Sequence, residues 1–222
     1  MINKNLFNKN VFKIGKSTIF LAIFALVGVL LLSIIYAQTE QRIKENQRQA
    51  LMKQLSEVLP VDRYDNVLDK AVIQLPQQVF KDYPPVIVYL ATSAAKPVAA
   101  IFMITTQQGY NGAIKLLIAV NKDQSIAAVR VVSHRETPGL GDKIDLTKND
   151  WILGFNQKSL LNPTLDGWAV KKDQGEFDQF TGATITPRAI VKTVRQVLQW
   201  SQQHFDELFT DKYKQVVDVN NH

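Results

Sequence analysis

The chain has 222 residues, enough for one substantial domain and an additional segment. It contains no cysteine, which excludes disulfides, thiol catalysis, iron–sulfur clusters and cysteine-based zinc sites within this chain. The formal net charge is +6, and four basic residues, Lys4, Lys9, Lys13 and Lys16, precede the first acidic residue, Glu40. Without those four, 22 of the 26 basic residues remain against 20 acidic ones. The basic charge therefore indicates membrane topology and not nucleic-acid binding.

An uncharged and mostly apolar segment, residues 17–39, follows these lysines. A helix of about 20 such residues spans roughly 30 Å, the thickness of a bilayer core. With lysines before it and an acidic residue after it, the segment predicts a transmembrane helix over 17–37 and a cytoplasmic N-terminus over 1–16. A signal peptide cleaved after Ala37 is the alternative, although the apolar run exceeds the ~7–15 residues typical of signal sequences.

A polar, helix-forming stretch comes next, over 38–60. Its apolar side chains recur on one approximate helical stripe, namely Ile43, Ala50, Leu51, Leu55 and Val58. The stripe predicts a helical stalk that packs against the following domain and ends at Pro60. Residues 61–84 are interpreted as an irregular connection with one apolar segment near Ala71–Leu75.

Four short segments rich in β-branched residues follow: Val86–Ala91, Val98–Thr105, Ile114–Val120 and Ile126–Ser133. Short polar turns separate them, which favours an antiparallel sheet. With helices at the ends, the sequence predicts an α+β fold, in which one domain over 61–209 has a mainly antiparallel sheet and flanking helices. The polar residues 210–222 are expected to form a fraying tail.

The fourth predicted strand leads into the loop Glu136-Thr137-Pro138-Gly139-Leu140-Gly141. Its two glycines allow backbone to approach a ligand closely, and Leu140 could cover an aromatic ring. Taken alone, the same residues favour a simple Pro-Gly turn between a strand and a helix.

Two further segments precede the final helix. A short helix is expected to begin near Asn149, and Trp168–Lys172 is interpreted as a strand. We interpret Trp168 as a core residue and not as a ligand-stacking one. Lys171 or Lys172 could face a bound phosphate or ligand ring, or stand in solvent at a strand edge, and the residue type does not choose between these roles.

The segment Asp178-Gln179-Phe180-Thr181-Gly182-Ala183-Thr184 stands before the final helix, which is expected to run from Pro187 to about Phe209. A stripe at helical spacing supports that helix: Ile190, Val191, Val194, Val197 and Leu198. Thr186 is the predicted N-cap. A glycine before a helix N-terminus offers free N–H groups and partial positive charge, which suit a phosphate. On local grounds alone, a capped helix after a polar loop is the simpler interpretation.

Together, the two blocks resemble a known family. The pattern Asp-x-x-(Ser/Thr)-Gly-Ala-Thr, present as Asp178 to Thr184, resembles the flavinylation signature of FMN-binding domains in bacterial Rnf (Rsx) and sodium-pumping NADH:quinone reductase complexes. Glu136 to Gly141 is similar to a second block of that family. The resemblance covers essentially the whole chain, which is similar to the Rnf/Rsx G subunits in length and topology.

The resemblance implies that a flavin transferase joins the phosphate of FMN to the hydroxyl of Thr184 as a phosphoester. It also implies cofactor-binding roles for Thr181, Gly182, Ala183, Glu136, Thr137, Gly139, Leu140, Gly141 and Lys171, and transferase recognition by Asp178. No catalytic side chain and no metal site are expected, since a flavin brings its own redox chemistry.

By the same resemblance, the chain is expected to be a redox subunit and not a stand-alone enzyme. It would relay electrons among the other membrane subunits of an Rnf/Rsx-type complex that couples electron transfer to ion translocation. Its FMN domain is expected on the periplasmic side of the bacterial inner membrane.

Two other classes remain open at this point. The same motif would occur in a C subunit of the sodium-pumping NADH:quinone reductase or in another extracytoplasmic flavin electron-transfer protein, and partner identity would distinguish these from a G subunit. A scaffolding module that binds no cofactor is the third possibility, and flavin fluorescence would separate it from the others.

Overall fold

The computed structural model describes the backbone of residues 4–213 and the side chains of 18–36 and 38–213. The chain divides into two compact units, one up to Gln49 and one from Ala50 onward. A single helix, α1 (Lys4–Val58), supplies the first unit and the opening turns of the second. Most of the predicted tail, residues 214–222, lies outside the described residues, as do the side chains of the predicted cytoplasmic segment.

The first unit contains the apolar segment. From Thr18 onward, α1 includes an 18-residue window with a mean hydropathy of 2.9, of which 0% is buried. Among the described residues it is the one helix long and apolar enough to span a membrane. Exposed leucine, isoleucine and phenylalanine side chains line this stretch between Ile19 and Ile35. Such a surface fits a membrane anchor.

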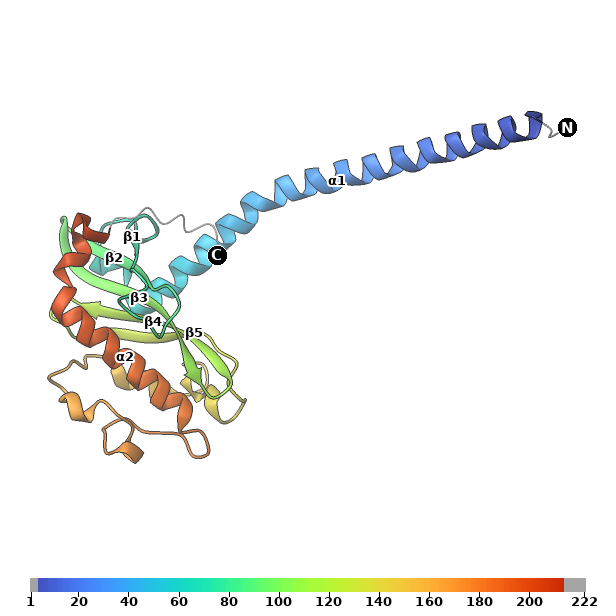
Figure 1. Ribbon diagram of the computed structural model, residues 1–222. Coiled ribbons are helices and arrows are strands. Elements are labelled where there is room, and N and C mark those ends of the chain that lie inside the picture. Colours follow the sequence, from blue (N-terminus) through green and yellow to red (C-terminus); the bar gives the residue numbers. More distant parts are fainter. Residues whose placement is uncertain (1–3, 214–222) are drawn as a thin grey trace. The chain divides into compact units, whose positions relative to one another are not determined.

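The second unit is built on a five-stranded sheet whose strands follow chain order (Figure 1). The strands are β1 (Val72–Gln74), β2 (Ile87–Ser93), β3 (Lys96–Gly109), β4 (Gly112–Asn121) and β5 (Ile126–Ser133). Every neighbouring pair is antiparallel, which confirms the predicted sheet. The edge strand β1 lies in the stretch interpreted as an irregular connection, and that interpretation is wrong at these three residues.

Both faces of the sheet are buried, as β3 shows. Ala100, Phe102 and Ile104 belong to one core cluster, while the alternating residues Ala99, Ile101 and Met103 belong to another. The first face lies against α2 (Ile185–His204), which crosses the sheet in Figure 1. The second face packs with Leu55, Val58 and Leu59 at the end of α1. The inner end of the predicted stalk stripe is therefore buried, as expected.

The predicted stripe on α2 is confirmed, because all five of its apolar side chains are buried. Each fully buried Val, Leu or Ile contributes about 1.5–3 kcal/mol relative to an exposed one, so this face fixes α2 on the sheet. The helix ends at His204, earlier than predicted, and a separate 3₁₀ helix spans Asp206–Phe209.

Short 3₁₀ helices lie before β1, between β5 and α2, and after α2. They span Val61–Arg63, Leu68–Lys70, Gly141–Ile144, Asp150–Phe155, Leu165–Gly167, Lys171–Asp173 and Asp211–Tyr213. The one at Asp150–Phe155 is the predicted short helix, and the side chain of Asn149 caps it by accepting a hydrogen bond from the Trp151 N–H at 2.9 Å.

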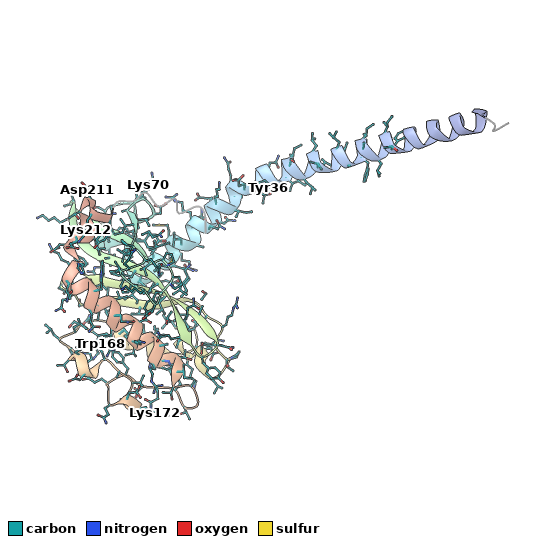
Figure 2. The ribbon with its side chains drawn as sticks, in the orientation of Figure 1. Tyr36, Lys70, Trp168, Lys172, Asp211 and Lys212 are labelled. Carbon is teal, nitrogen blue, oxygen red and sulfur yellow. The ribbon has the colours of Figure 1, made fainter. Side chains whose placement is uncertain are left out.

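The predicted strand at Trp168–Lys172 is wrong. Only Val170 forms a single β-bridge, with Phe177, and the next residues turn back through a local hydrogen bond from the Asp173 N–H to the Val170 carbonyl at 2.8 Å. Trp168 is 1% exposed and lies 5.0 Å from Phe177 between ring centres, so its prediction as a core residue is confirmed. Figure 2 shows Trp168 beside α2 and Lys172 further out on the same loop.

Candidate functional site

The segment before α2 makes a tight turn at Phe180–Ala183. The Ala183 N–H donates to the Phe180 carbonyl at 3.0 Å, and the two residues form a β-bridge. Gly182 adopts φ 79°, a left-handed conformation that favours glycine. Thr181 and Gly182 are exposed at the turn, so this part of the segment is accessible from solvent.

The start of α2 differs from the prediction. The helix begins at Ile185, which puts Thr184 at the N-cap position and Thr186 inside the first turn. Thr186 is fully buried and donates its hydroxyl hydrogen to the Glu136 carboxylate, so it does not cap the helix as predicted. The half-buried Thr184 side chain makes no capping hydrogen bond either. Its hydroxyl is therefore uncommitted among the described residues.

Glu136 is the buried polar centre of the neighbouring loop, with 5% of its surface exposed. Its Oε1 accepts from the Asn111 N–H at 3.0 Å, and its Oε2 accepts from the Thr186 hydroxyl. The Glu136 N–H donates to His134 Nδ1 at 3.1 Å. The carboxylate thus joins the β3–β4 turn to the first turn of α2.

The remainder of this loop folds over the Thr137 carbonyl, which accepts from the N–H groups of Leu140 and Gly141, both at 3.1 Å. Leu140 is 43% exposed, and its Cδ2 lies 3.6 Å from where a Cβ on Gly182 would stand. The two sequence blocks are therefore adjacent in space.

Gly141 is required by this packing. A Cβ at that position would stand 2.7 Å from Glu136 Oε2 and 3.1 Å from Thr186 Oγ1. Contacts below 3 Å force atoms to move, so only glycine lets the loop pass over the buried carboxylate.

Asp178 is held at the other end of the segment. The Trp151 Nε1–H donates to the Asp178 carbonyl at 2.8 Å, and the Trp151 ring meets the Phe180 ring edge-on at 5.3 Å between centres. The Asp178 carboxylate forms an exposed ion pair with Lys171 at 2.6 Å. Lys171 and Asp178 therefore stand together on the outer side of the segment.

A second exposed ion pair lies on the first turns of α2. Arg188 donates to Asp173 from Nε at 2.6 Å and from a terminal nitrogen at 2.8 Å. The Arg188 hydrogen bond lowers the pKa of Asp173, and the same bond raises the pKa of Arg188. This bidentate contact fastens the loop at 171–173 to α2.

The structure thus brings Thr181 to Thr184 next to the loop of Glu136 to Gly141, and it places Lys171 with Asp178. Sequence reasoning does not predict how three residues hold this arrangement: it gives Asn111 and Trp151 no role in the site, and it expects Thr186 to cap the helix instead. Asn111 donates from its backbone N–H to Glu136 and from its side-chain amide to the Arg135 carbonyl at 2.8 Å, and neither partner is close to it in sequence. The indole of Trp151 and the hydroxyl of Thr186 acquire their roles from partners distant in sequence.

This arrangement fits a phosphate carrying an aromatic ring. The N–H groups of Ile185 and Thr186 open α2 and have no backbone acceptor among the described residues, and a helix N-terminus attracts an anion. Ile185 and Leu140 are 45% and 43% exposed, and Leu140 adjoins Gly182, so both offer apolar surface near the start of α2. The uncommitted Thr184 hydroxyl stands at the same helix start.

Comparison with known families agrees with that fit. Residues 109–199 match the FMN-binding domain family, a span from the end of β3 to most of α2 that includes both sequence blocks. The second unit therefore contains an FMN-binding domain.

The rest of the chain identifies the family more closely. Residues 6–58 match the RnfG N-terminal region. The chain is 40% identical over 198 residues to the G subunit of the ion-translocating oxidoreductase complex of Pseudoalteromonas atlantica, covering 89% of this chain and 92% of the relative. It is 43% identical over 194 residues to the corresponding subunit of Pseudomonas aeruginosa, covering 87% and 91%. The chain belongs to the family of G subunits of ion-translocating oxidoreductase complexes.

Proposed function

We propose that this chain carries FMN as a phosphoester on Thr184 and relays electrons between other subunits of an Rnf/Rsx-type complex that couples electron transfer to ion translocation. Membership of the G-subunit family and the FMN-binding domain support the redox role. The other subunits and a flavin transferase are the partners in this proposal.

The choice of Thr184 as the attachment site rests on how three threonine hydroxyls near α2 differ in burial and in hydrogen bonding. Thr186 is buried and bonded to Glu136, so it has no free hydroxyl to modify. Thr184 is half-buried, uncommitted and located at the helix N-terminus. Thr181 is exposed in the turn before Gly182, and the helix begins only at Ile185. Thr184 alone combines a free hydroxyl with an anion-favouring backbone.

The remaining residues of the site have distinct roles in this proposal. The N–H groups of Ile185 and Thr186 bind phosphate oxygens, and Gly182 permits the turn that exposes Thr184. Leu140 and Ile185 exclude water from one side of an aromatic ring. In the attachment step, the Thr184 oxygen attacks the flavin-side phosphorus of a flavin dinucleotide held by the transferase. The phosphoanhydride bond of that donor breaks, the nucleoside monophosphate leaves, and the hydroxyl proton passes to solvent.

A bound FMN supplies one- and two-electron transfer, for which the chain needs no catalytic side chain of its own. The protein contributes position and electrostatics. We assign Thr137, Gly139, Gly141, Ala183 and Lys171 to the surroundings of the cofactor. Asp178 is exposed beside Lys171, which suits recognition by a flavin transferase better than contact with a buried ring.

We further propose that the FMN domain lies on the periplasmic side of the bacterial inner membrane. Residues 1–16 are then cytoplasmic, 17–37 span the membrane, 38–60 form the stalk, 61–209 form the domain and 210–222 form the tail. Lysines before the apolar segment and an acidic residue after it support this orientation.

Flavin fluorescence on a denaturing gel tests the covalent link, and purification of the tagged chain from membranes tests the partners. We expect a fluorescent band at the size of this chain and co-purification of flavin and iron–sulfur subunits. A chain that is non-fluorescent after denaturation, although produced with its transferase, would contradict covalent attachment. Co-purification with quinone reductase subunits instead would identify the alternative complex.

A further inference from the structure

We propose that the Glu136 carboxylate and the Thr186 hydroxyl form one buried positioning pair that sets the location of Thr184 for flavin attachment. The inference rests on the proposed function, because it takes Thr184 as the attachment point. Neither member of the pair touches the flavin through its side chain. Both act by fixing the backbone that carries Thr184.

Three parts of the fold converge on Glu136. The β3–β4 turn reaches it through the Asn111 N–H, at 3.0 Å from Oε1. The loop after β5 passes over it at Gly141, where a Cβ would stand 2.7 Å from Oε2. Helix α2 reaches it through the Thr186 hydroxyl. One side chain therefore holds a turn, a loop and a helix start together.

The chemistry makes these contacts interdependent. A buried carboxylate is costly unless both oxygens accept hydrogen bonds, and Asn111 and Thr186 provide one donor to each oxygen. No ion pair among the described residues includes Glu136. Loss of the Thr186 donor leaves Oε2 of Glu136 without its hydrogen bond. We expect the carboxylate to shift in response, which weakens its contacts with Asn111 and with the loop at Gly141.

This pair fixes the position of Thr184. It stands two residues before Thr186, and its own side chain makes no capping hydrogen bond that would hold it. Its carbonyl accepts from the Arg188 N–H at 3.2 Å, which ties Thr184 to the first turn of α2. Thr186 fixes that turn on one side, and the Phe180–Ala183 turn holds the segment on the other. A phosphoryl transfer requires its nucleophile within a narrow range of positions, so a shift of the helix start affects the rate steeply.

The first test compares backbone hydrogen exchange in the full-length, flavin-free protein. Thr186→Val keeps the shape of the side chain and removes its hydroxyl. Two hydrogen-bonded amides report on the 180–186 segment and the distant 109–113 turn: the Ala183 N–H, bonded to the Phe180 carbonyl, and the Asn111 N–H, bonded to Glu136. We expect both to exchange roughly tenfold faster. Thr186→Ser keeps a hydroxyl and is expected to exchange as the wild type does.

Thr193→Val is the matched control. Thr193 is on the same helix and is equally buried. Its hydroxyl donates to the Ala189 carbonyl at 2.8 Å and lies 3.2 Å from the Tyr83 hydroxyl, so the change removes buried hydrogen bonds that do not involve Glu136. It lies two turns from the motif. We expect it to leave exchange in the 109–113 turn and the 180–186 segment unchanged.

The second test measures the initial rate of covalent FMN attachment by the flavin transferase, at a temperature where every variant is folded. We expect Thr186→Val to slow attachment roughly ten- to hundredfold, while Thr186→Ser and Thr193→Val stay near the wild-type rate. Glu136→Gln should retain part of the rate, because its amide oxygen still accepts from Asn111 and its NH₂ group can donate to Thr186.

Unchanged exchange in both segments of Thr186→Val would overturn the inference, and so would attachment to that variant at the wild-type rate. Equal slowing by Thr193→Val would also overturn it, because the effect would then reflect stability alone. A wild-type chain that accepts no covalent flavin contradicts the proposed function instead, and the exchange comparison still decides whether the pair couples the two segments.

Discussion

The Cδ2 methyl group of Leu140 lies 3.6 Å from where a Cβ on Gly182 would stand, so the loop after β5 touches the turn before α2. These residues belong to two sequence blocks that lie far apart along the chain, and their contact makes one surface from two motifs. Because Leu140 is 43% exposed, its side chain remains available to a ligand bound there.

Leu140→Ala is therefore expected to change the flavin and not its attachment. The substitution removes apolar cover beside Gly182 but leaves Thr184 and the helix start intact. The variant should carry covalent FMN with a shifted redox potential or absorption spectrum. Spectroelectrochemistry measures both, and Leu161→Ala, at an 84% exposed leucine, is the matched control. If the flavin had the wild-type redox potential and absorption spectrum in both variants, the prediction that Leu140 lies beside the flavin would be wrong.

Gly182→Ala is expected to destabilise the domain through its backbone. The position has φ 79°, which costs a residue with a Cβ about 1–2 kcal/mol. A clash is not the reason, because the new Cβ would meet Leu140 at an ordinary contact distance. Denaturant unfolding measures the loss. Gly154→Ala, where the added Cβ meets nothing within 4 Å, should change stability by less than about 0.5 kcal/mol. Equal effects in the two variants would contradict this account.

The Asp173–Arg188 pair predicts a pH-dependent contribution to stability. Arg188 lowers the pKa of Asp173 from its usual 3.8, so the folded state favours the ionised carboxylate. The contribution is present above pH 3.8 and is lost as the pH falls through the lowered pKa. Asp173→Asn should therefore lower the melting temperature slightly at pH 7, and the difference should vanish at strongly acidic pH.

Thermal unfolding of both proteins from strongly acidic to neutral pH measures that difference. Asp166→Asn is the control, since Asp166 is exposed and forms no ion pair among the described residues. A difference between wild type and Asp173→Asn that grows as the pH falls would have the wrong sign for this pair.

Membrane orientation gives a further prediction. With lysines inside and the FMN domain outside, alkaline phosphatase fused after residue 60 should be active. The same fusion with the four N-terminal lysines replaced by glutamate should lose part of its activity, because the orientation signal is removed. A mature chain whose N-terminus is Gln38 would show that the apolar segment is cleaved and not retained.

Much of the fold follows from local sequence. The four longer strands are rich in β-branched residues and end at polar turns, and the stripe on α2 has clear helical spacing. Both faces of the sheet are buried, so β3 is a nearly continuous apolar run. It lacks the alternation of apolar and polar residues that is typical of a strand with one exposed face. The edge strand β1 has only three residues, too few for a pattern.

The errors arise where hydrogen bonds that the sequence pattern does not reveal, some distant and some local, override residue preference. Thr186 has the residue type of an N-cap, but it is buried and its hydroxyl donates to the carboxylate of Glu136, fifty positions earlier. Trp168–Lys172 has strand-like composition, but local hydrogen bonds coil it instead. The motif residues came from a family resemblance, whereas the contacts that hold them, through Asn111, Trp151 and Thr186, depend on the tertiary fold.

The central claim is that Thr184 carries the FMN, and peptide mass spectrometry tests it directly. Cleavage after Lys172 and Arg188 yields one fragment, residues 173–188, that contains Thr181, Thr184 and Thr186. Fragmentation of the flavin-bearing peptide should place the added FMN mass on Thr184. Thr184→Ala should abolish covalent FMN, while Thr181→Ser keeps it. Flavin still covalently attached to the Thr184→Ala protein, or an FMN mass located on Thr181 of the wild type, would contradict the account.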